Sequence, residues 1–303
     1  MSNIEVFKDN GQILFDTSLI CYGLIKSGNM SLQQYWSRRH LRSAQLDPND
    51  GANWTAVVVV AGNGTPAQGS RSDQLWGFTV NNALSPICFI TGSGTLIGTS
   101  ISGGAFTFLY SNASTDTKFY CFDLMSDNLA GTTFIKIYDT TSKITFNSLQ
   151  PPLNVVGAYQ SPAPPAAGAP DGNKYLTYNG GRVQKRQYMG GAPGGSLASQ
   201  MDCIVDVSLS SGVEYAAFLP WSRAATITET QESTTGGTIQ YSVVEGAYGR
   251  VGGISFMFGA SAGTNEAVPS GVNYAPATYK NIPTDRYPTA LYIQTANLPF
   301  PFN

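Results

Sequence analysis

Ser261 lies at the centre of Gly259-Ala260-Ser261-Ala262-Gly263, the G-x-S-x-G spacing that exposes a nucleophilic serine in α/β hydrolases. Such a serine needs a helix directly after it and a histidine later in the chain to accept its proton. The only histidine, His40, lies far upstream, and no helical pattern follows in residues 264–269. The motif therefore indicates a turn of small residues rather than a hydrolase.

Carboxylates are the other catalytic candidates. Hydrolysis of a glycosidic bond needs two of them about 5–10 Å apart in a cleft. Glu229 and Glu232 are close in the sequence, but the Thr-rich run 226–235 around them has the composition of an exposed turn. The chain has 19 Asp and Glu residues, which leaves other pairs open. We predict that the chain is not an enzyme and keep a glycan depolymerase as the alternative.

The residues that could bind a metal or a cofactor lack the sequence spacing that such sites require. Residues 92–98, Gly-Ser-Gly-Thr-Leu-Ile-Gly, are glycine-rich but lack the Lys-Ser/Thr ending of a phosphate-binding loop, so they predict a β-turn. The cysteines lie tens of residues apart, match no zinc pattern and are expected to be buried free thiols: Cys21, Cys88, Cys121 and Cys203. One imidazole cannot build a multi-histidine metal site. We therefore predict neither a metal nor a cofactor.

Aromatic side chains of the second half are the strongest binding candidates, since 10 of the 16 tyrosines follow residue 173. Tyr and Trp rings offer an apolar face with a polar handle, which suits both sugars and protein surfaces. Four of these rings lie at a strand end or in turns bounded by Gly or Pro: Trp221, Tyr248, Tyr274 and Tyr279. We predict them as surface recognition residues; the alternative is that each ring packs into the core or a subunit interface.

The elements that must position these residues are strands. Short alternating or apolar runs separated by Gly, Asn, Asp, Ser and Pro predict an all-β fold. Strands are expected at 55–60, 75–80, 87–91, 105–110, 118–123, 174–178, 204–209, 215–219, 238–244, 253–258 and 290–295. At most one short helix is expected, at about 31–43, where Ser31 and Gln34 resemble a capping box.

Two hairpins of similar sequence indicate an internal repeat. Residues 4–7 and 13–15 flank a turn that contains Asn10 and Gly11, and residues 135–139 and 144–148 repeat the pattern. The first hairpin ends in Phe15-Asp16 and the second in Phe146-Asn147, each followed by a hydroxyl residue. The Asp or Asn side chain can accept a hydrogen bond from the backbone two residues on and so close a turn.

The Pro- and Ala-rich segment 160–172 predicts a semi-rigid linker, because prolines and small residues favour an extended backbone. We therefore expect two β-sandwich-like domains, 1–159, framed by the two hairpins, and 173–303, rich in tyrosine. The apolar tail, residues 297–303, is expected to dock on its own domain or on a neighbouring subunit.

The composition excludes several classes of protein. Only 12% of the residues are charged and the formal net charge is −2, without the basic stripe of a nucleic-acid-binding protein. The one basic segment, residues 38–42, has three arginines, too few for a nucleic-acid footprint. The first residues lack the basic and apolar regions of a signal peptide, so we expect synthesis in a reducing cytoplasm.

The first hairpin, Val6-Phe7-Lys8-Asp9-Asn10-Gly11-Gln12-Ile13-Leu14-Phe15-Asp16-Thr17, resembles the opening of minor tail and tail-tip fibre proteins of long-tailed, siphovirus-like bacteriophages. The second hairpin resembles the same element at the close of that domain, with Asn147 in place of Asp and no turn glycine. The resemblance covers about the first 160 residues, and its specific part is about 40 of them. It brings no catalytic residues. It implies a virion component that assembles at the tail end, as a symmetric oligomer, with a distal domain that contacts the host envelope.

The sequence thus predicts a structural protein of a phage tail tip or tail fibre, made in the host cytoplasm and carried on the virion. Its expected partners are other tail proteins, further copies of itself, with a trimer favoured, and a host surface glycan or envelope protein. The alternatives are a tail-borne glycan depolymerase and a non-viral lectin-like adhesin.

Overall fold

The computed structural model describes residues 4–16, 19–37, 39–41, 47, 50–56, 58–60, 66–70, 72–127, 129, 131, 134–165, 170–171, 174–188, 198–230, 238–260, 267–268 and 278–303. The protein is all-β, as predicted from its alternating runs. Within the described ranges the one helical element is a single 3-10 turn, η1 (Gly51–Asn53).

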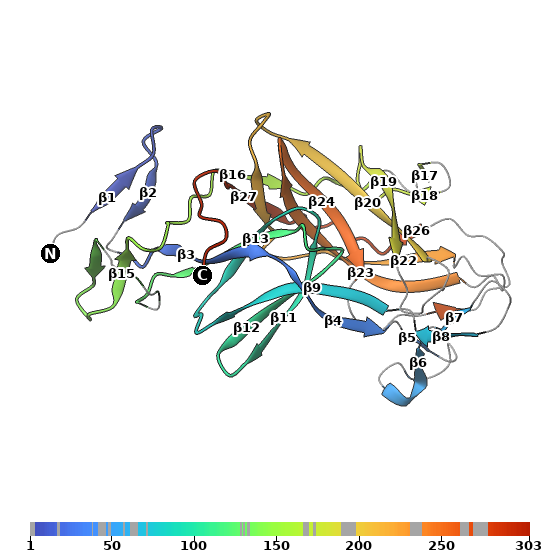
Figure 1. Cartoon of the computed structure of the whole chain (residues 1–303). Coiled ribbons are helices and arrows are strands. Elements are labelled where there is room, and N and C mark those ends of the chain that lie inside the picture. Colours follow the sequence, from blue (N-terminus) through green and yellow to red (C-terminus); the bar gives the residue numbers. More distant parts are fainter. Residues whose placement is uncertain are drawn as a thin grey trace.

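A sheet of 13 strands forms the body of the molecule (Figure 1). Its main path runs through β16 (Gly157–Gln160), β27 (Thr289–Gln294), β21 (Tyr215–Phe218), β10 (Ile87–Thr91), β23 (Thr238–Arg250), β24 (Gly253–Ala260), β20 (Ala198–Ser208) and β19 (Arg182–Tyr188). Off this path, β13 (Lys118–Leu124) joins β10 to β3 (Tyr22–Asn29). Likewise β22 (Ala224–Thr230) joins β23 to β26 (Thr278–Lys280), and β25 (Ala267–Val268) pairs with β23.

A second sheet has four strands in the order β11 (Thr95–Ser102), β12 (Ala105–Ser111), β9 (Ser72–Asn81) and β4 (Ser31–Ser37), seen below the large sheet in Figure 1. The remaining strands form two-stranded sheets: β1 (Glu5–Phe7) with β2 (Ile13–Asp16), β14 (Lys136–Tyr138) with β15 (Ile144–Asn147), β5 (Arg39–Leu41) with β6 (Trp54–Ala56), β7 (Val58–Val60) with β8 (Pro66–Ser70), and β17 (Pro170–Asp171) with β18 (Lys174–Tyr175).

Several predicted strands are confirmed with close boundaries. The expected strands 87–91, 118–123 and 253–258 correspond to β10, β13 and β24. Of the predicted β-turn at residues 92–98, residues 92–94 connect β10 to β11, with a φ of 87° at Gly92 that favours glycine, whereas residues 95–98 lie in β11. These elements follow from local patterns alone, because each is a continuous apolar run with a glycine or a polar turn at its end.

The predicted division into domains 1–159 and 173–303 is corrected by the strand pairing. Strand β10, from the first predicted domain, pairs with β21 at Ala217 and with β23 at Gly249, both from the second. One core also contains Phe78 and Phe108 together with Met257. The start of the predicted linker is part of the main sheet, because β16, which ends at Gln160, pairs with β27 and the next residue, Ser161, is buried. An extended Pro-rich segment can follow a sheet edge as readily as it can cross a gap between domains.

The helix expected at 31–43 is absent from the described part of that segment, which forms β4 and β5. Strand β4 pairs with β9 from Ser31 to Ser37, with a register shift between Leu32 and Gln34. A capping box contributes only about 1 kcal/mol. The free edge of β9 offers a full ladder of backbone hydrogen bonds, and this tertiary pairing overrides the local helical signal.

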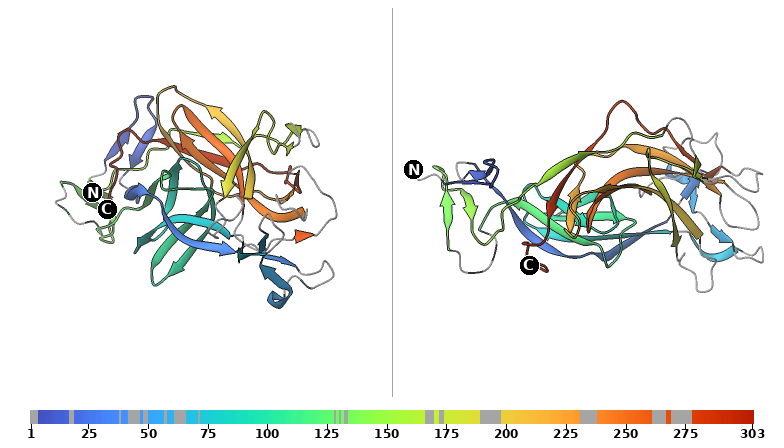
Figure 2. Two further views of the ribbon diagram at one scale, coloured as in Figure 1. Left: turned by 45° about the vertical axis from the view of Figure 1, so that its right-hand side comes forward. Right: turned by 90° about the horizontal axis from the view of Figure 1, so that it is seen from above.

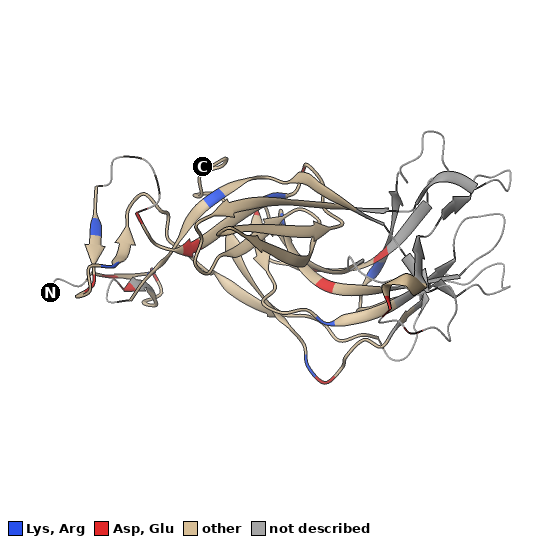
Figure 3. Cartoon of the chain, turned by 90° about the horizontal axis from the view of Figure 1, so that it is seen from below, with Lys and Arg blue, Asp and Glu red and all other residues tan. Residues whose placement is uncertain are grey.

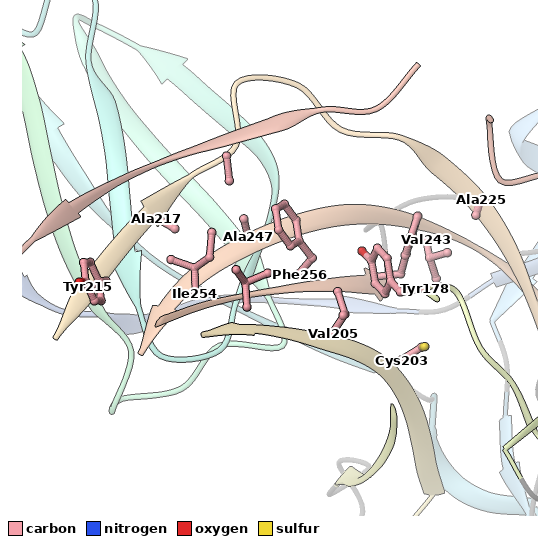
Figure 4. Packing of buried hydrophobic residues seen from close by; sticks show 13 residues of the cluster. Tyr178, Cys203, Val205, Tyr215, Ala217, Ala225, Val243, Ala247, Ile254 and Phe256 are labelled. Carbon is pink, nitrogen blue, oxygen red and sulfur yellow. The ribbon is translucent and has the colours of Figure 1, made fainter. Parts of the chain in front are cut away.

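A second core lies on the other side of the large sheet, where Phe256 and Phe258 pack with Tyr178 and Val205 (Figure 4). The C-terminal tail docks on its own chain. The backbone N–H of Ser27 donates to the carbonyl of Phe302 at 2.9 Å, and the reverse bond measures 3.1 Å. The tail therefore covers strand β3, which belongs to the predicted domain 1–159, and not to the tail's own predicted domain 173–303.

Candidate functional site

The two related hairpins lie beside one another at one end of the molecule, beyond the 13-stranded sheet (Figures 1 and 2). Their registers are the same. Val6 opposes Phe15 in one hairpin, Ile137 opposes Phe146 in the other, and each register shifts at the next residue. Adding 131 to a residue number in the first hairpin gives its equivalent in the second, as Val6 and Ile137 show. The predicted internal repeat is thus confirmed in the backbone.

The turns of the two hairpins also match. Gly11 and its equivalent Ser142 have positive φ angles, 79° and 64°. Positive φ suits glycine, whereas a serine there needs support from its surroundings. The Asp139 carboxylate provides that support, because it accepts hydrogen bonds from the backbone N–H of Thr141 at 2.7 Å and of Lys143 at 2.9 Å. In the second copy Ser142 thus occupies the glycine position, and the Asp139 carboxylate stabilises the turn around it.

In the second hairpin, the residue that ends the strand closes a turn with its side chain, as the sequence predicts. The Asn147 Oδ1 accepts the backbone N–H of Leu149 at 3.0 Å, two residues on, and its Nδ2 donates to the carbonyl of Ser126 at 2.8 Å. In the first copy the carbonyl of Asp16 accepts the backbone N–H of Leu19 at 3.1 Å. Phe146 is half-buried, and the side chain of Phe15 lies outside the described residues.

The chain segments that follow the hairpins pair with each other. Gly23 and Pro152 form an antiparallel bridge, and the backbone N–H of Leu153 donates to the carbonyl of Tyr22 at 2.9 Å. Tyr22 and Leu153 are themselves equivalent in the repeat. Two equivalent residues that face one another in an antiparallel pair are the arrangement expected of two copies related by a local two-fold axis.

The hairpins expose large apolar side chains at equivalent positions. Ile4 and its equivalent Ile135 are 43% and 50% exposed, while Phe7 and Tyr138 are 53% and 51% exposed. The neighbouring Phe134 is 92% exposed. Scattered exposed apolar residues are ordinary on a protein surface, but here they recur at equivalent positions of both hairpins, which makes this end a candidate interaction surface. We call residues 4–16 and 134–148 the paired-hairpin end.

Two charged positions of the paired-hairpin end have opposite signs in the two copies. Glu5 is equivalent to Lys136, and Lys8 is equivalent to Asp139. A hydrogen bond to Asp127 raises the pKa of Lys136, and a bond from the Lys143 backbone lowers the pKa of Asp139, so both residues are ionised at neutral pH. Figure 3 shows both signs at this end and further charges of both signs along the rest of the described ribbon.

The four predicted recognition residues do not come together. Trp221 is exposed in the loop before β22. Tyr248 is buried in the core between the two sheets, because β23 continues through it instead of ending in a turn. Tyr279, in β26, packs its ring on Phe258 with centroids 6.2 Å apart. Tyr274 lies outside the described residues. The prediction is therefore wrong for Tyr248, which is buried, whereas Tyr279 is half-buried and Trp221 remains a surface candidate.

The motifs weighed for catalysis gain no support. Gly259 and Ala260 close strand β24, whereas Ser261 lies outside the described residues, as does Glu232 and the side chain of Glu229. His40 lies in strand β5, opposite Thr55. The described part of the chain contains no group of three His, Cys, Asp or Glu side chains that could hold a metal ion.

One polar cleft of about 210 Å³ lies between β3, β9 and the start of the loop after β13. Its charged side chains already serve the surrounding backbone. Lys26 Nζ donates to the carbonyl of Thr79 at 2.9 Å, and the Asp123 carboxylate accepts the backbone N–H groups of Leu84 and Ser85, each at 2.7 Å. These bonds hold the loop between β9 and β10, which is a structural role.

A buried ion pair is the feature that the sequence analysis missed. The Arg223 guanidinium donates from Nε to Glu245 Oε2 at 2.7 Å and from Nη2 to Oε1 at 2.9 Å, and both side chains are fully buried. Tyr178 donates to Glu245 Oε1 at 2.9 Å, and Ser161 donates to the same oxygen. No local signal points to this cluster, because its members lie up to 84 residues apart in the sequence.

Thiol reactivity tests how deeply the four cysteines are buried. We expect an alkylating reagent to label one cysteine of the folded chain, because Cys21 is partly exposed whereas Cys88, Cys121 and Cys203 are buried. Burial also raises the pKa of Cys88 to about 12, and thiolates are the reactive species. Labelling of Cys21 should accelerate as the pH rises, since burial and then Asp16 raise its pKa. Intact-mass spectrometry counts the labels; more than one on the folded chain, or one on Cys21→Ser, contradicts the structure.

No family model, curated protein or solved structure matches this chain. Within the described residues, no helix has the length and apolar character needed to cross a membrane.

Proposed function

We propose that this chain is a structural, non-enzymatic component of a bacteriophage tail tip or tail fibre, and that it assembles through the paired-hairpin end. The observation that carries the proposal is the repeat itself: two hairpins of one register expose apolar side chains at the same positions, Ile4 with Ile135 and Phe7 with Tyr138. An isolated two-stranded hairpin is marginally stable in water. A surface of two such hairpins therefore gains stability from a partner that covers it.

The resemblance of the first hairpin to tail-tip proteins supports a bacteriophage tail as the particle that contains this chain. The all-β body is consistent with that assignment. Its partners are other tail proteins and further copies of itself, with a trimer favoured. The body extends away from the paired-hairpin end, which leaves it free to approach a host glycan or envelope protein (Figure 2). Several weak contacts on one particle then act together through multivalency.

The proposal is tested on particles produced by cells that carry the gene. An antibody against this chain, followed by electron microscopy, should label the tail tip of phage particles, and the neighbouring genes should encode tail proteins. Unlabelled particles, or a locus without phage genes, would overturn the proposal. Incubation with the host surface polysaccharide tests its non-enzymatic part, because released oligosaccharide would instead identify a glycan depolymerase.

A further inference from the structure

The charge reversal between the two hairpins is more than a difference in composition. Glu5 and Lys136 occupy equivalent positions in β1 and β14, and Lys8 and Asp139 occupy equivalent positions at the starts of the two turns. Each charge flanks one of the exposed apolar positions. At these two positions the hairpins therefore carry charges of opposite sign beside exposed apolar residues, whereas Asp9, Asp16 and Lys143 have uncharged equivalents.

We propose that the partner on the paired-hairpin end is a second copy of this chain, with the first hairpin of one copy packed against the second hairpin of the next. This inference rests on the proposed role of that end as an assembly surface and names its occupant. In this arrangement Ile4 and Phe7 of one copy pack near Ile135 and Tyr138 of its neighbour, and Glu5 lies near Lys136.

Charge complementarity selects this arrangement over the alternatives. If the first hairpin packed against another first hairpin, Glu5 would meet Glu5, and like charges opposite one another destabilise a contact. Packing of unlike hairpins brings Glu5 toward Lys136 and Lys8 toward Asp139, so opposite charges meet at both positions. Within one chain Lys136 also binds Asp127, and Lys8 Nζ donates to the carbonyl of Val155 at 2.9 Å. The apolar patches supply most of the binding free energy, since they lose water on contact, and the charges set which hairpin meets which.

Charge exchange on the full-length chain tests the inference. Light scattering and sedimentation over a range of concentrations should show association of the unmodified protein. Glu5→Lys and Lys136→Glu should each weaken it roughly tenfold, because each places like charges together at the contact. The chain that carries both changes should regain the original association. Lys143→Glu is the matched control, because its equivalent, Gln12, is uncharged, and it should have little effect.

Carbodiimide cross-linking provides a readout that needs no variant. A carbodiimide joins a carboxylate to an amine in direct contact, so a mixture of isotopically light and heavy chains should yield a mixed Glu5–Lys136 cross-link. Single variants that associate normally, or a double variant that fails to recover, would overturn the inference. A protein that is monomeric at every concentration would also overturn it, while labelled tail tips would still support the proposed function with another tail protein on this surface.

Discussion

Replacing Glu245 with glutamine is expected to destabilise the fold by about 3–5 kcal/mol, because it leaves the Arg223 guanidinium buried without a counter-charge. A carboxamide has nearly the same shape as the carboxylate, so the change removes charge without opening a cavity. It also replaces one acceptor oxygen by a donor, in a site where Arg223, Tyr178 and Ser161 all donate. The free energy of unfolding, from urea titration, measures the loss.

The ion pair joins distant segments, which is why its loss should affect the whole molecule. Arg223 precedes β22 and Glu245 lies in β23, while Ser161 follows β16. The guanidinium also lies 4.9 Å from the centroid of the Tyr287 ring, in the segment before β27. A single buried charge pair therefore fixes how four segments meet at one side of the sheet.

Two comparisons make this prediction specific. Arg182→Gln breaks an exposed pair with Asp206, 3.1 Å long, and should cost no more than about 1 kcal/mol because water screens such pairs. Replacing both partners, Arg223→Met with Glu245→Leu, should recover part of the stability that Glu245→Gln loses, since no unpaired charge remains. If Glu245→Gln costs no more than Arg182→Gln, the buried pair does not have the role assigned to it.

Replacing Gly249 with alanine is expected to cost at least about 3 kcal/mol or to prevent folding, because the new methyl group would overlap main-chain atoms. A Cβ on Gly249 would lie 1.8 Å from the carbonyl oxygen of Tyr215 and 2.6 Å from the Cα of Ala216. Backbone atoms in a paired strand cannot rotate away as the end of a side chain can. The strands β21 and β23 would have to separate.

Gly98→Ala is the matched control. Gly98 also lies within a strand, β11, but its added Cβ would meet no atom within 4 Å. Its stability should change by no more than about 1 kcal/mol, and a small gain is expected where alanine only restricts the unfolded chain. Soluble yield and the midpoint of denaturation distinguish the two variants. Equal stability of Gly249→Ala and Gly98→Ala would show that β21 and β23 do not approach as described.

Gly249 also belongs to a segment whose structure differs from the turn that its sequence predicts. Gly246 and Gly249 flank Tyr248, and glycines on both sides of a tyrosine predict a turn with an exposed ring. In the structure the same glycines permit close approach of neighbouring strands, Thr95 at Gly246 and Tyr215 at Gly249. Strand β23 therefore continues to Arg250 and buries the tyrosine. The sequence carries the same glycines in either case, and the tertiary contact decides their meaning.

The strands, the turns and the repeated hairpins follow from local patterns in the amino-acid sequence. Each depends on residues within about ten positions of one another: alternation sets the strand faces, and turn residues set the reversals. The hairpins at residues 4–16 and 135–148 were predicted for this reason, including the turn that Asn147 closes.

The choice of strands that share a sheet, and of apolar residues that stay exposed, depends on contacts between distant segments. Ile90 pairs with Ala217, and Glu245 meets Arg223 and Ser161, through contacts that no local pattern encodes. The exposure of Ile4, Phe7 and their equivalents likewise follows from the position of the hairpins beyond the main sheet. Local propensity selects the type of an element, but burial and pairing depend on segments far apart in the chain, because the free energy comes from surfaces that meet only after folding.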